Sequence, residues 1–242
     1  MIPAFLLCVL VLCIWIHYEN KKSSKSEKKD RDSFWQKEHE ADFVRKKDIS
    51  SLDYISIPME GLPFGLLEQI PENMPLKSPS FPETSSGNSP EAMTVPPEEE
   101  LPVEKLVSVI KNCEQTIRDL SQKKILNLTG ITNTELKLEY GAGNLDELSC
   151  YDQNFTLLVR TLHQWGSSLN ALGFTKAAQE VLEFGIACGS DVSRSYILLA
   201  RIYREQNNVD GLDHLLLNAQ DLKTLTKSSI IEKVQTERNY CS

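Results

Sequence analysis

The prolines of this 242-residue chain constrain its fold more than any other feature, because a proline breaks a helix and cannot sit in a central strand. Eight of the eleven prolines lie between Pro71 and Pro102, and none follows Pro102. Only the proline-free stretch after Pro102 is long enough to bury a sizeable core. The sequence therefore predicts an all-α chain of four parts: a transmembrane anchor over residues 1–18, a charged juxtamembrane segment over 19–66, a disordered linker over 67–102 and a helical domain over 103–242.

The first residues form an apolar run, Ile2–Trp15, which carries no charge and continues through Tyr18. A run of this length is at the short end of the range for a helix that spans a bilayer. No Lys or Arg precedes it and no small-residue cleavage site follows it, so an uncleaved anchor is favoured over a secretory signal peptide. Five lysines between Lys21 and Lys29 follow directly. The positive-inside rule then predicts a single-pass membrane protein whose C-terminal domain lies in the cytoplasm.

The juxtamembrane segment is predicted to contain one short helix and one extended piece. Ser33–Lys47 has high helix propensity and begins with a serine that could cap the helix. Ser51–Gly65 contains Pro58 and Pro63, so neither a helix nor a central strand can run through it. Its isolated large apolar residues suit either a docking peptide for another protein or a loop packed on its own domain. The linker that follows is rich in Pro, Ser and Glu and has too little apolar surface to order itself.

Beyond the linker, apolar residues recur at three- and four-residue steps, which is the spacing of a helical stripe. Residues 129–150 differ, because they contain three glycines and a short alternating run, TELKLEY, which predicts a loop with a small strand-like piece. The remaining segments are predicted helices joined by short connections, which favour antiparallel neighbours. They are Val103–Leu128, Asn154–Leu172, Thr175–Cys188, Ser193–Asn207, Val209–Leu222 and Thr226–Arg238.

An offset of 34 residues aligns four of these helices in two pairs. Most aligned positions match a large residue with a large one, and two match small with small. The aligned positions are Leu162 with Tyr196, Trp165 with Leu199, Gly166 with Ala200, Leu169 with Tyr203, Ala178 with Leu212, Leu182 with Leu216 and Gly185 with Ala219. The pattern predicts two copies of one helix–turn–helix unit.

The residues at these positions read L-x₂-W-G-x₂-L with A-x₃-L in the first copy, and Y-x₂-L-A-x₂-Y with L-x₃-L in the second. Together with the period, they resemble tetratricopeptide repeats over residues 159–222, about a quarter of the chain. The closing prolines of that family are missing, and Leu212 replaces a small residue. An ordinary four-helix packing is the alternative. Two repeats are too few to be stable alone, so the helices before and after them are expected to cover the open ends.

The resemblance implies a concave groove lined by the first helix of each repeat. The residues that spacing places on this face are Arg160, His163, Ser167 and Asn170 from one helix, and Arg194, Ile197, Arg201 and Arg204 from the other. Because arginine offers bidentate hydrogen bonds to carboxylates, the predicted partner is a protein that presents an acidic peptide. A merely solvated helix face is the alternative. The chain's own Glu98–Glu100 cluster could also occupy the groove and compete with a partner.

Other functional classes lack support in the sequence. The net charge of −8 gives no reason to expect nucleic acid, because phosphate binding needs a clustered basic surface. The six scattered cysteines include no C-x-x-C pair, and the four histidines form no metal-binding motif. No nucleophile elbow or phosphate-binding glycine loop occurs. The expected protein is not an enzyme, and no cofactor, metal or small-molecule substrate is predicted.

Two functions remain open at this point. The first is a membrane-tethered scaffold or adaptor that binds a cytosolic protein through the groove. The second is an accessory subunit of a membrane enzyme or transport complex, which would contact its complex through the transmembrane helix. Exchanging Ile2–Tyr18 for an unrelated apolar helix separates them, because only the second function needs that particular sequence.

Overall fold

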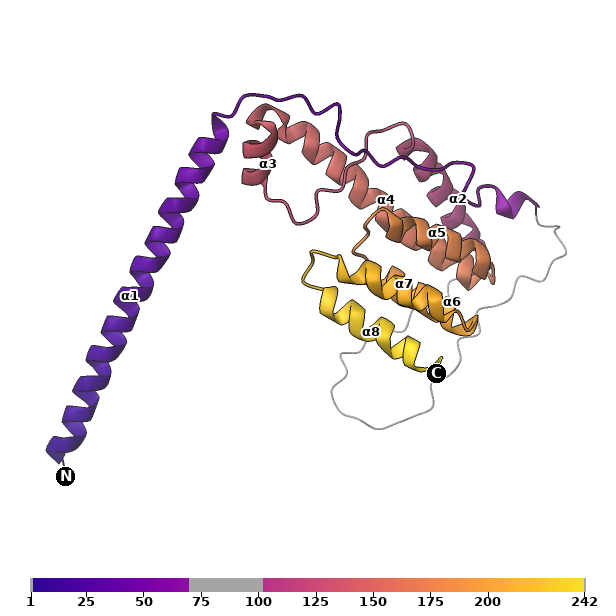
Figure 1. Ribbon diagram of the computed structural model, residues 1–242. Coiled ribbons are helices and arrows are strands. Elements are labelled where there is room, and N and C mark those ends of the chain that lie inside the picture. The colour runs from indigo at the N-terminus through magenta and orange to yellow at the C-terminus, as the bar shows by residue number, and fades with distance from the viewer. Residues whose placement is uncertain (1, 70–101, 242) are drawn as a thin grey trace. The chain divides into compact units, whose positions relative to one another are not determined.

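The computed structural model describes residues 2–69 and 102–241, and within these ranges the regular structure is helical, with no strand. The chain divides into two compact units, which are described separately (Figure 1). The first unit comprises Met1–Leu52 and Ile131–Glu147, and the second comprises Asp53–Gly130 and Leu148–Ser242. The all-α prediction is thus confirmed for the described residues. Most of the predicted linker, residues 70–101, lies outside them.

The first unit is dominated by helix α1, Ile2–Asp42, which is continuous over 41 residues. At about 1.5 Å per residue, a helix of this size is about 60 Å long. The sequence predicted a separate short helix at Ser33–Lys47, but these residues begin inside α1, and the helix ends at Asp42. The continuity has a local cause, because the run from Glu19 to Glu40 contains no proline or glycine and consists largely of strong helix formers.

The predicted transmembrane segment falls largely on residues whose side chains the structure does not describe. Over the part of the chain that is described, no helix is both long and apolar enough to cross a membrane.

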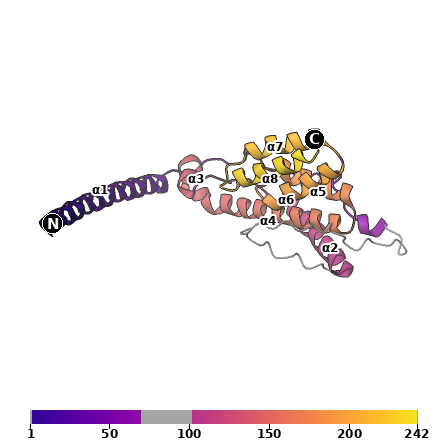
Figure 2. The same ribbon diagram turned by 90° about the horizontal axis from the view of Figure 1, so that it is seen from below.

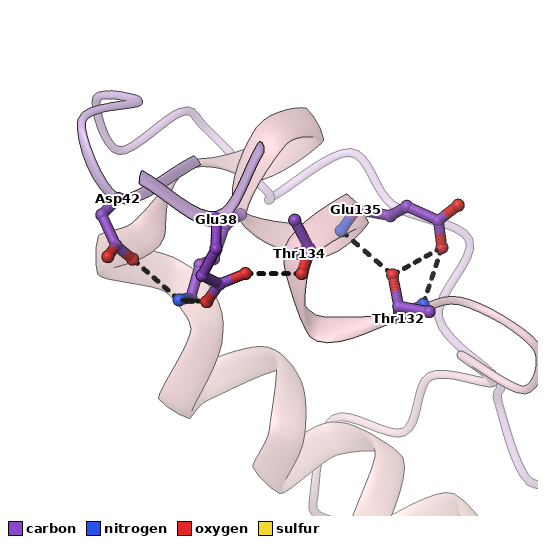
Figure 3. A network of polar contacts seen from close by, with 6 residues as sticks. Glu38, Asp42, Thr132, Thr134 and Glu135 are labelled. Atoms are coloured by element: carbon purple, nitrogen blue, oxygen red, sulfur yellow. Dashed lines mark hydrogen bonds and ion pairs between the residues drawn. The ribbon is translucent and has the colours of Figure 1, made fainter. Parts of the chain in front are cut away.

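The strand-like piece predicted within residues 129–150 is wrong, because TELKLEY belongs to helix α3, Asn133–Tyr140. The cause is a capping box at the start of this helix. The Thr132 hydroxyl accepts the Glu135 N–H at 3.3 Å, and the Glu135 carboxylate accepts the Thr132 N–H at 2.8 Å. Figure 3 shows this reciprocal pair. A two-residue alternation over seven residues was too short a signal to compete with an explicit helix start.

A second polar cluster joins α3 to the end of α1 within the first unit (Figure 3). The Lys137 ammonium donates to Glu38 and, at 2.7 Å, to Asp42, while the Thr134 hydroxyl donates to Glu38 at 2.5 Å. Hydrogen bonds from Lys137 and then Thr134 hold the pKa of the Glu38 carboxyl below its usual value. The hydrogen bonds to Asp42 and Glu38 raise the pKa of Lys137. These directions mean that Glu38 and Lys137 are both charged at neutral pH.

The second unit contains helices that pack around one apolar core (Figures 1 and 2). They are α2 (Val103–Leu120), most of α4 (Leu145–Ala171), α5 (Thr175–Ala187), α6 (Ser193–Glu205), α7 (Val209–Gln220) and α8 (Lys227–Asn239), with a short 3₁₀ helix η1 at Leu66–Gln69. The helix starts at Thr175, Ser193 and Val209 agree with the sequence prediction. By contrast, α4 begins nine residues earlier than the predicted Asn154, and α2 ends at Leu120.

An extended segment, residues 53–67, packs on the helices of the second unit and is called the strap below. Ile57 and Leu62 are buried in the core, and the Ile55 N–H donates to the carbonyl of Ile125 at 2.9 Å. The Phe64 ring lies 5.1 Å from the ring of Trp165. Of the two alternatives left open by the sequence, the structure therefore shows a segment packed on its own domain. The second unit accordingly starts 50 residues before the predicted boundary at residue 103.

Helices of the second unit begin at a fixed interval. α5 begins at Thr175 and α7 at Val209, 34 positions later. α6 begins at Ser193 and α8 at Lys227, again 34 positions later. The sequence alignment stopped at Leu222, so the repetition extends further along the chain than the residue pattern indicated. In α8 the buried residues Ile230 and Val234 stand 34 positions after the buried Tyr196 and Ala200 of α6.

The turns that end α4 and α6 repeat at the same interval. Gly173 and Asn207 both have a positive φ, 87° and 53°, which is the left-handed conformation that closes a Schellman motif. The long bond of the motif is the same in both turns: Phe174 N–H donates to the Leu169 carbonyl at 2.9 Å, and Asn208 N–H donates to the Tyr203 carbonyl at 2.8 Å. The two hairpins therefore share their turn geometry, although α4 with 27 residues is longer than α6 with 13.

The residues aligned by the 34-residue offset are all buried in the structure: Leu162, Trp165, Gly166, Leu169, Ala178, Leu182, Gly185, Tyr196, Leu199, Ala200, Tyr203, Leu212, Leu216 and Ala219. Burial of both members of each pair explains why size is matched at most of them. A small residue is needed where α4 passes over α5, because a Cβ on Gly166 would lie 2.8 Å from Cγ of Leu182.

Gly166 and Gly185 give a matched test of that packing. Replacing either glycine by alanine should gain about 1 kcal/mol from helix propensity. At Gly166 the new methyl group must displace the buried Leu182, which costs about 1–3 kcal/mol, so Gly166→Ala should lower the free energy of unfolding. At Gly185 the Cβ would meet Leu162 at an ordinary 3.6 Å, so Gly185→Ala should raise it. Urea denaturation measures both, and equal effects of the same sign would contradict this packing.

Candidate binding face on helices α4 and α6

The predicted groove residues lie on two helices that touch within the second unit. The Ser195 hydroxyl of α6 and Nδ1 of His163 on α4 are 3.2 Å apart. Ser195 is buried, so this contact fixes the neighbouring surface positions on both helices. The structure leaves the predicted residues at least partly accessible: Arg160, Arg194 and Arg201 are exposed, and His163, Ser167, Asn170, Ile197 and Arg204 are half-buried.

Two of the arginines on α6 already hold a carboxylate of the chain itself. Nη1 of Arg204 lies 2.5 Å from Oε2 of Glu237 on α8, and Nε of Arg201 lies 3.5 Å from Oε1 of the same residue. The Glu237 side chain is only 13% exposed, whereas the Arg201 side chain is 53% exposed. The Arg204 guanidinium also lies 5.8 Å from the ring centroid of Tyr240. Arg204 is therefore largely used within the fold, and Arg201 is used in part.

Arg160 and Arg194 differ from that pair. They stand at equivalent positions, 34 residues apart, and both are exposed. Across residues 2–69 and 102–241, neither forms a salt bridge. Of the predicted stripe, Arg160 on α4 and Arg194 on α6 are thus the exposed arginines outside internal salt bridges, and His163 of α4 is taken together with them. This set is called the α4–α6 face below.

Sequence reasoning missed the role of Glu237, although a signal was present. The predicted covering helix Thr226–Arg238 includes Glu237 but was not aligned with the repeats. One further step of 34 residues aligns Ile230 and Val234 with Tyr196 and Ala200 in the sequence. This match predicts which face of α8 is buried, and therefore how α8 is turned relative to α6. With that orientation, Glu237 falls beside the last turn of α6, where Arg204 lies.

Three side chains of the second unit that could carry chemistry, Cys113, Cys188 and Tyr203, are held in unreactive states. Burial raises the pKa of the Cys113 and Cys188 thiols to about 11, so both remain protonated at neutral pH. A thiol rather than a thiolate is a poor nucleophile and a poor metal ligand. The Tyr203 hydroxyl donates to Glu183 at 2.7 Å, and burial followed by that contact raises its pKa. Among the described residues, no cluster of His, Cys, Asp and Glu could hold a metal ion.

Comparison of this chain with protein-family models, with curated proteins and with solved structures finds no match.

Proposed function

We propose that this chain is a membrane-tethered interaction module that binds an acidic segment of a cytosolic protein on the α4–α6 face. The supporting observation is the pair Arg160 and Arg194, two exposed arginines at equivalent positions on neighbouring helices. An exposed guanidinium can form two parallel hydrogen bonds with one carboxylate. Two such groups on one surface favour a partner that presents more than one acidic residue.

The internal contact with Glu237 supports the same chemistry. Arg201 and Arg204 hold this carboxylate from one helix turn of α6, although it comes from another helix. Arg194, in the first turn of α6, forms no such internal salt bridge among the described residues, so its guanidinium can bind a carboxylate of another protein. The 34-residue interval of helix starts and turns supports a repeat of the tetratricopeptide type, in which the first helices of successive units line the binding surface.

Charge reversal on the α4–α6 face tests the binding function. The double substitution Arg160→Glu with Arg194→Glu should weaken binding of a fluorescein-labelled hexaglutamate peptide at least tenfold, because attraction is replaced by repulsion. Fluorescence anisotropy with the full chain in detergent micelles measures it, and rising salt should weaken wild-type binding. Arg201 is avoided because its substitution would also release Glu237.

The matched control reverses two exposed lysines outside this face, Lys176→Glu with Lys233→Glu, and changes the net charge by the same amount. It should leave peptide binding within about twofold of wild type, since screening limits the reach of distant surface charges. If both double variants lost the same amount of peptide affinity, the effect would be due to net charge and not to the α4–α6 face. Unchanged binding in the Arg160/Arg194 variant would refute the proposed face.

The tether in this proposal is Ile2–Tyr18, and it rests on the sequence. The run is uncharged, and five lysines between Lys21 and Lys29 follow it. In helix α1, Trp15 and Tyr18 are exposed, as aromatic residues at a membrane interface would be. Deleting residues 2–18 should move the chain from carbonate-washed membranes to the soluble fraction. Persistence of the shortened chain in the washed membranes would contradict the tether.

A further inference from the structure

A hollow of about 280 Å³ opens on the second unit, and neither Arg160 nor Arg194 belongs to its lining. Its walls come from three places: the segment after α2, the junction between α5 and α6, and the end of α7. The lining residues that carry polar groups are Asn127, Thr129, Asp191, Tyr196, Asn218, Asp221, Lys223 and Thr224. Concave sites with a few convergent polar groups are where proteins hold small ligands.

The electrostatics of the hollow favour a positive charge. Two carboxylates, Asp191 and Asp221, line it against the single ammonium of Lys223. Helix α5 ends at Ala187 and α7 ends at Gln220, and residues at both ends belong to the lining. The C-terminal end of a helix carries about half a negative charge from its free carbonyl groups. The end of α5 adds to the negative charge of the two aspartates, whereas the Gln220 carbonyl at the end of α7 accepts a hydrogen bond from the Lys227 ammonium.

The wall is organised by hydrogen bonds rather than by loose side chains. The Asn127 amide donates to the carbonyls of Cys188 at 3.4 Å and Gly189 at 3.3 Å, and its own oxygen accepts the Thr129 N–H at 3.0 Å. Gly189 has a φ of +82°, and a Cβ at this position would lie 2.8 Å from the Asn127 amide nitrogen. The segment after α2 is thus fixed to the end of α5, and the hollow is part of the fold.

Tyr196 is the independent sign that a ligand belongs here. Its side chain is 1% exposed and lines the hollow. Among the described residues its hydroxyl makes no hydrogen bond, and it is not one of the fully buried unsatisfied polar atoms, so it is open to the hollow. Burial, followed by the charge of Asp191, raises its pKa to about 12, so the hydroxyl stays neutral and can accept a hydrogen bond from a ligand.

We infer that this hollow binds a compact organic cation, an alkylammonium or guanidinium group, with Asp191 and Asp221 facing the charge and the Tyr196 hydroxyl accepting one of its N–H groups. The cation can come from a free diamine or from a lysine side chain of a bound peptide. The site is separate from the α4–α6 face, so either can fail without the other.

Isothermal titration calorimetry on the full chain in detergent micelles tests this site with two probes, 1,4-diaminobutane and the peptide acetyl-Gly-Lys-Gly-amide. Saturable binding of at least one probe is expected, and the better probe identifies the source of the cation. Butyrate, which carries the opposite charge, should not bind. Absence of saturable binding by both cationic probes would overturn the inference.

Isosteric substitutions assign the binding to the lining residues. Asp191→Asn with Asp221→Asn should weaken the better probe at least tenfold, and Tyr196→Phe should weaken it about two- to tenfold, the worth of one hydrogen bond. Glu205→Gln, an exposed carboxylate on α6 outside the hollow, is the charge control and should change nothing. Tyr196→Phe removes one oxygen and should keep the wild-type melting temperature, so its weaker binding cannot be ascribed to unfolding. Equal binding by wild type and the aspartate variant would refute the site. The Arg160/Arg194 variant should bind the cation normally.

Discussion

Replacing Trp165 by alanine is expected to lower the free energy of unfolding of the second unit by about 3–5 kcal/mol. Trp165 is fully buried on α4 and is among the largest buried side chains of the core. The centroid of the Phe64 ring, in the strap, lies 5.1 Å from that of the Trp165 ring. The guanidinium of Arg118, on α2, lies 4.6 Å from the centroid of the same Phe64 ring. Removing the indole therefore removes packing contacts of α4 in the core and the contact with Phe64 of the strap.

Trp165→Phe separates the packing of Trp165 from its polar group. The indole N–H of Trp165 is buried, and no hydrogen-bond partner for it is found among the described residues. Phenylalanine removes this unsatisfied donor and keeps most of the apolar volume, so it should cost less than about 2 kcal/mol. Urea denaturation followed by circular dichroism measures both variants. Losses of equal size would mean that the ring volume is not what holds the core.

The strap should respond to the same substitution. With Trp165→Ala, Phe64 loses its aromatic neighbour, and a protease should cut residues 53–67 faster than in wild type at a urea concentration where both remain folded. Unchanged strap cleavage in a destabilised Trp165→Ala variant would show that the strap is held mainly by Ile57 and Leu62.

Replacing Gly141 by alanine is expected to break the joint between the two segments of the first unit. Gly141 ends α3 with a φ of 91° and a ψ of 143°, a conformation that non-glycine residues rarely adopt. A Cβ there would lie 2.2 Å from the carbonyl oxygen of Arg45 and 2.8 Å from the Cα of Lys46. Both are backbone atoms, so no side-chain rotation can relieve the overlap.

The loss can be followed at one amide. The Lys47 N–H donates to the Tyr140 carbonyl at 3.0 Å, and the buried Asn144 amide donates to the Lys47 carbonyl at 2.8 Å and to the Tyr140 carbonyl at 2.7 Å. In Gly141→Ala, hydrogen exchange at Lys47 should speed up at least tenfold. Gly143→Ala is the matched control, because its Cβ would meet Lys46 at an ordinary 3.5 Å. If Gly141→Ala exchanged at the wild-type rate, the close approach of these segments would be refuted.

The sequence predictions were most accurate where local signals decided the structure. The helix starts at Thr175, Ser193 and Val209 follow short turns and clear apolar periodicity, and all three were placed correctly. The large and small matches across the 34-residue offset predicted core positions because burial imposes size on both members of each pair. The failure at TELKLEY has a specific reason. An alternation over seven residues is short enough for a local helix signal to override it, and Thr132 with Glu135 supplied that signal through the capping box.

Long-range pairings could not be read from the sequence. The strap binds through Ile57, Leu62 and Phe64, which look alike in a loop packed on its own domain and in a peptide that docks elsewhere. Likewise, Glu237 is one acidic residue among many until α8 is placed on α6 beside Arg204. For this reason the sequence could not show that Arg201 and Arg204 pair with Glu237 inside the fold, and the candidate binding face is smaller than the predicted one.

The strap also decides what a single backbone nick would do to this molecule. Residues 53–67 belong to one compact unit with α2, most of α4 and α5 to α8, although residues 70–101 separate them from these helices in the sequence. A cut anywhere between residues 70 and 101 would yield two polypeptides that stay associated through the contacts of Ile57, Leu62 and Phe64. The N-terminal fragment would therefore still carry the C-terminal one, as in a protein assembled by fragment complementation, and denaturing electrophoresis alone would register the break.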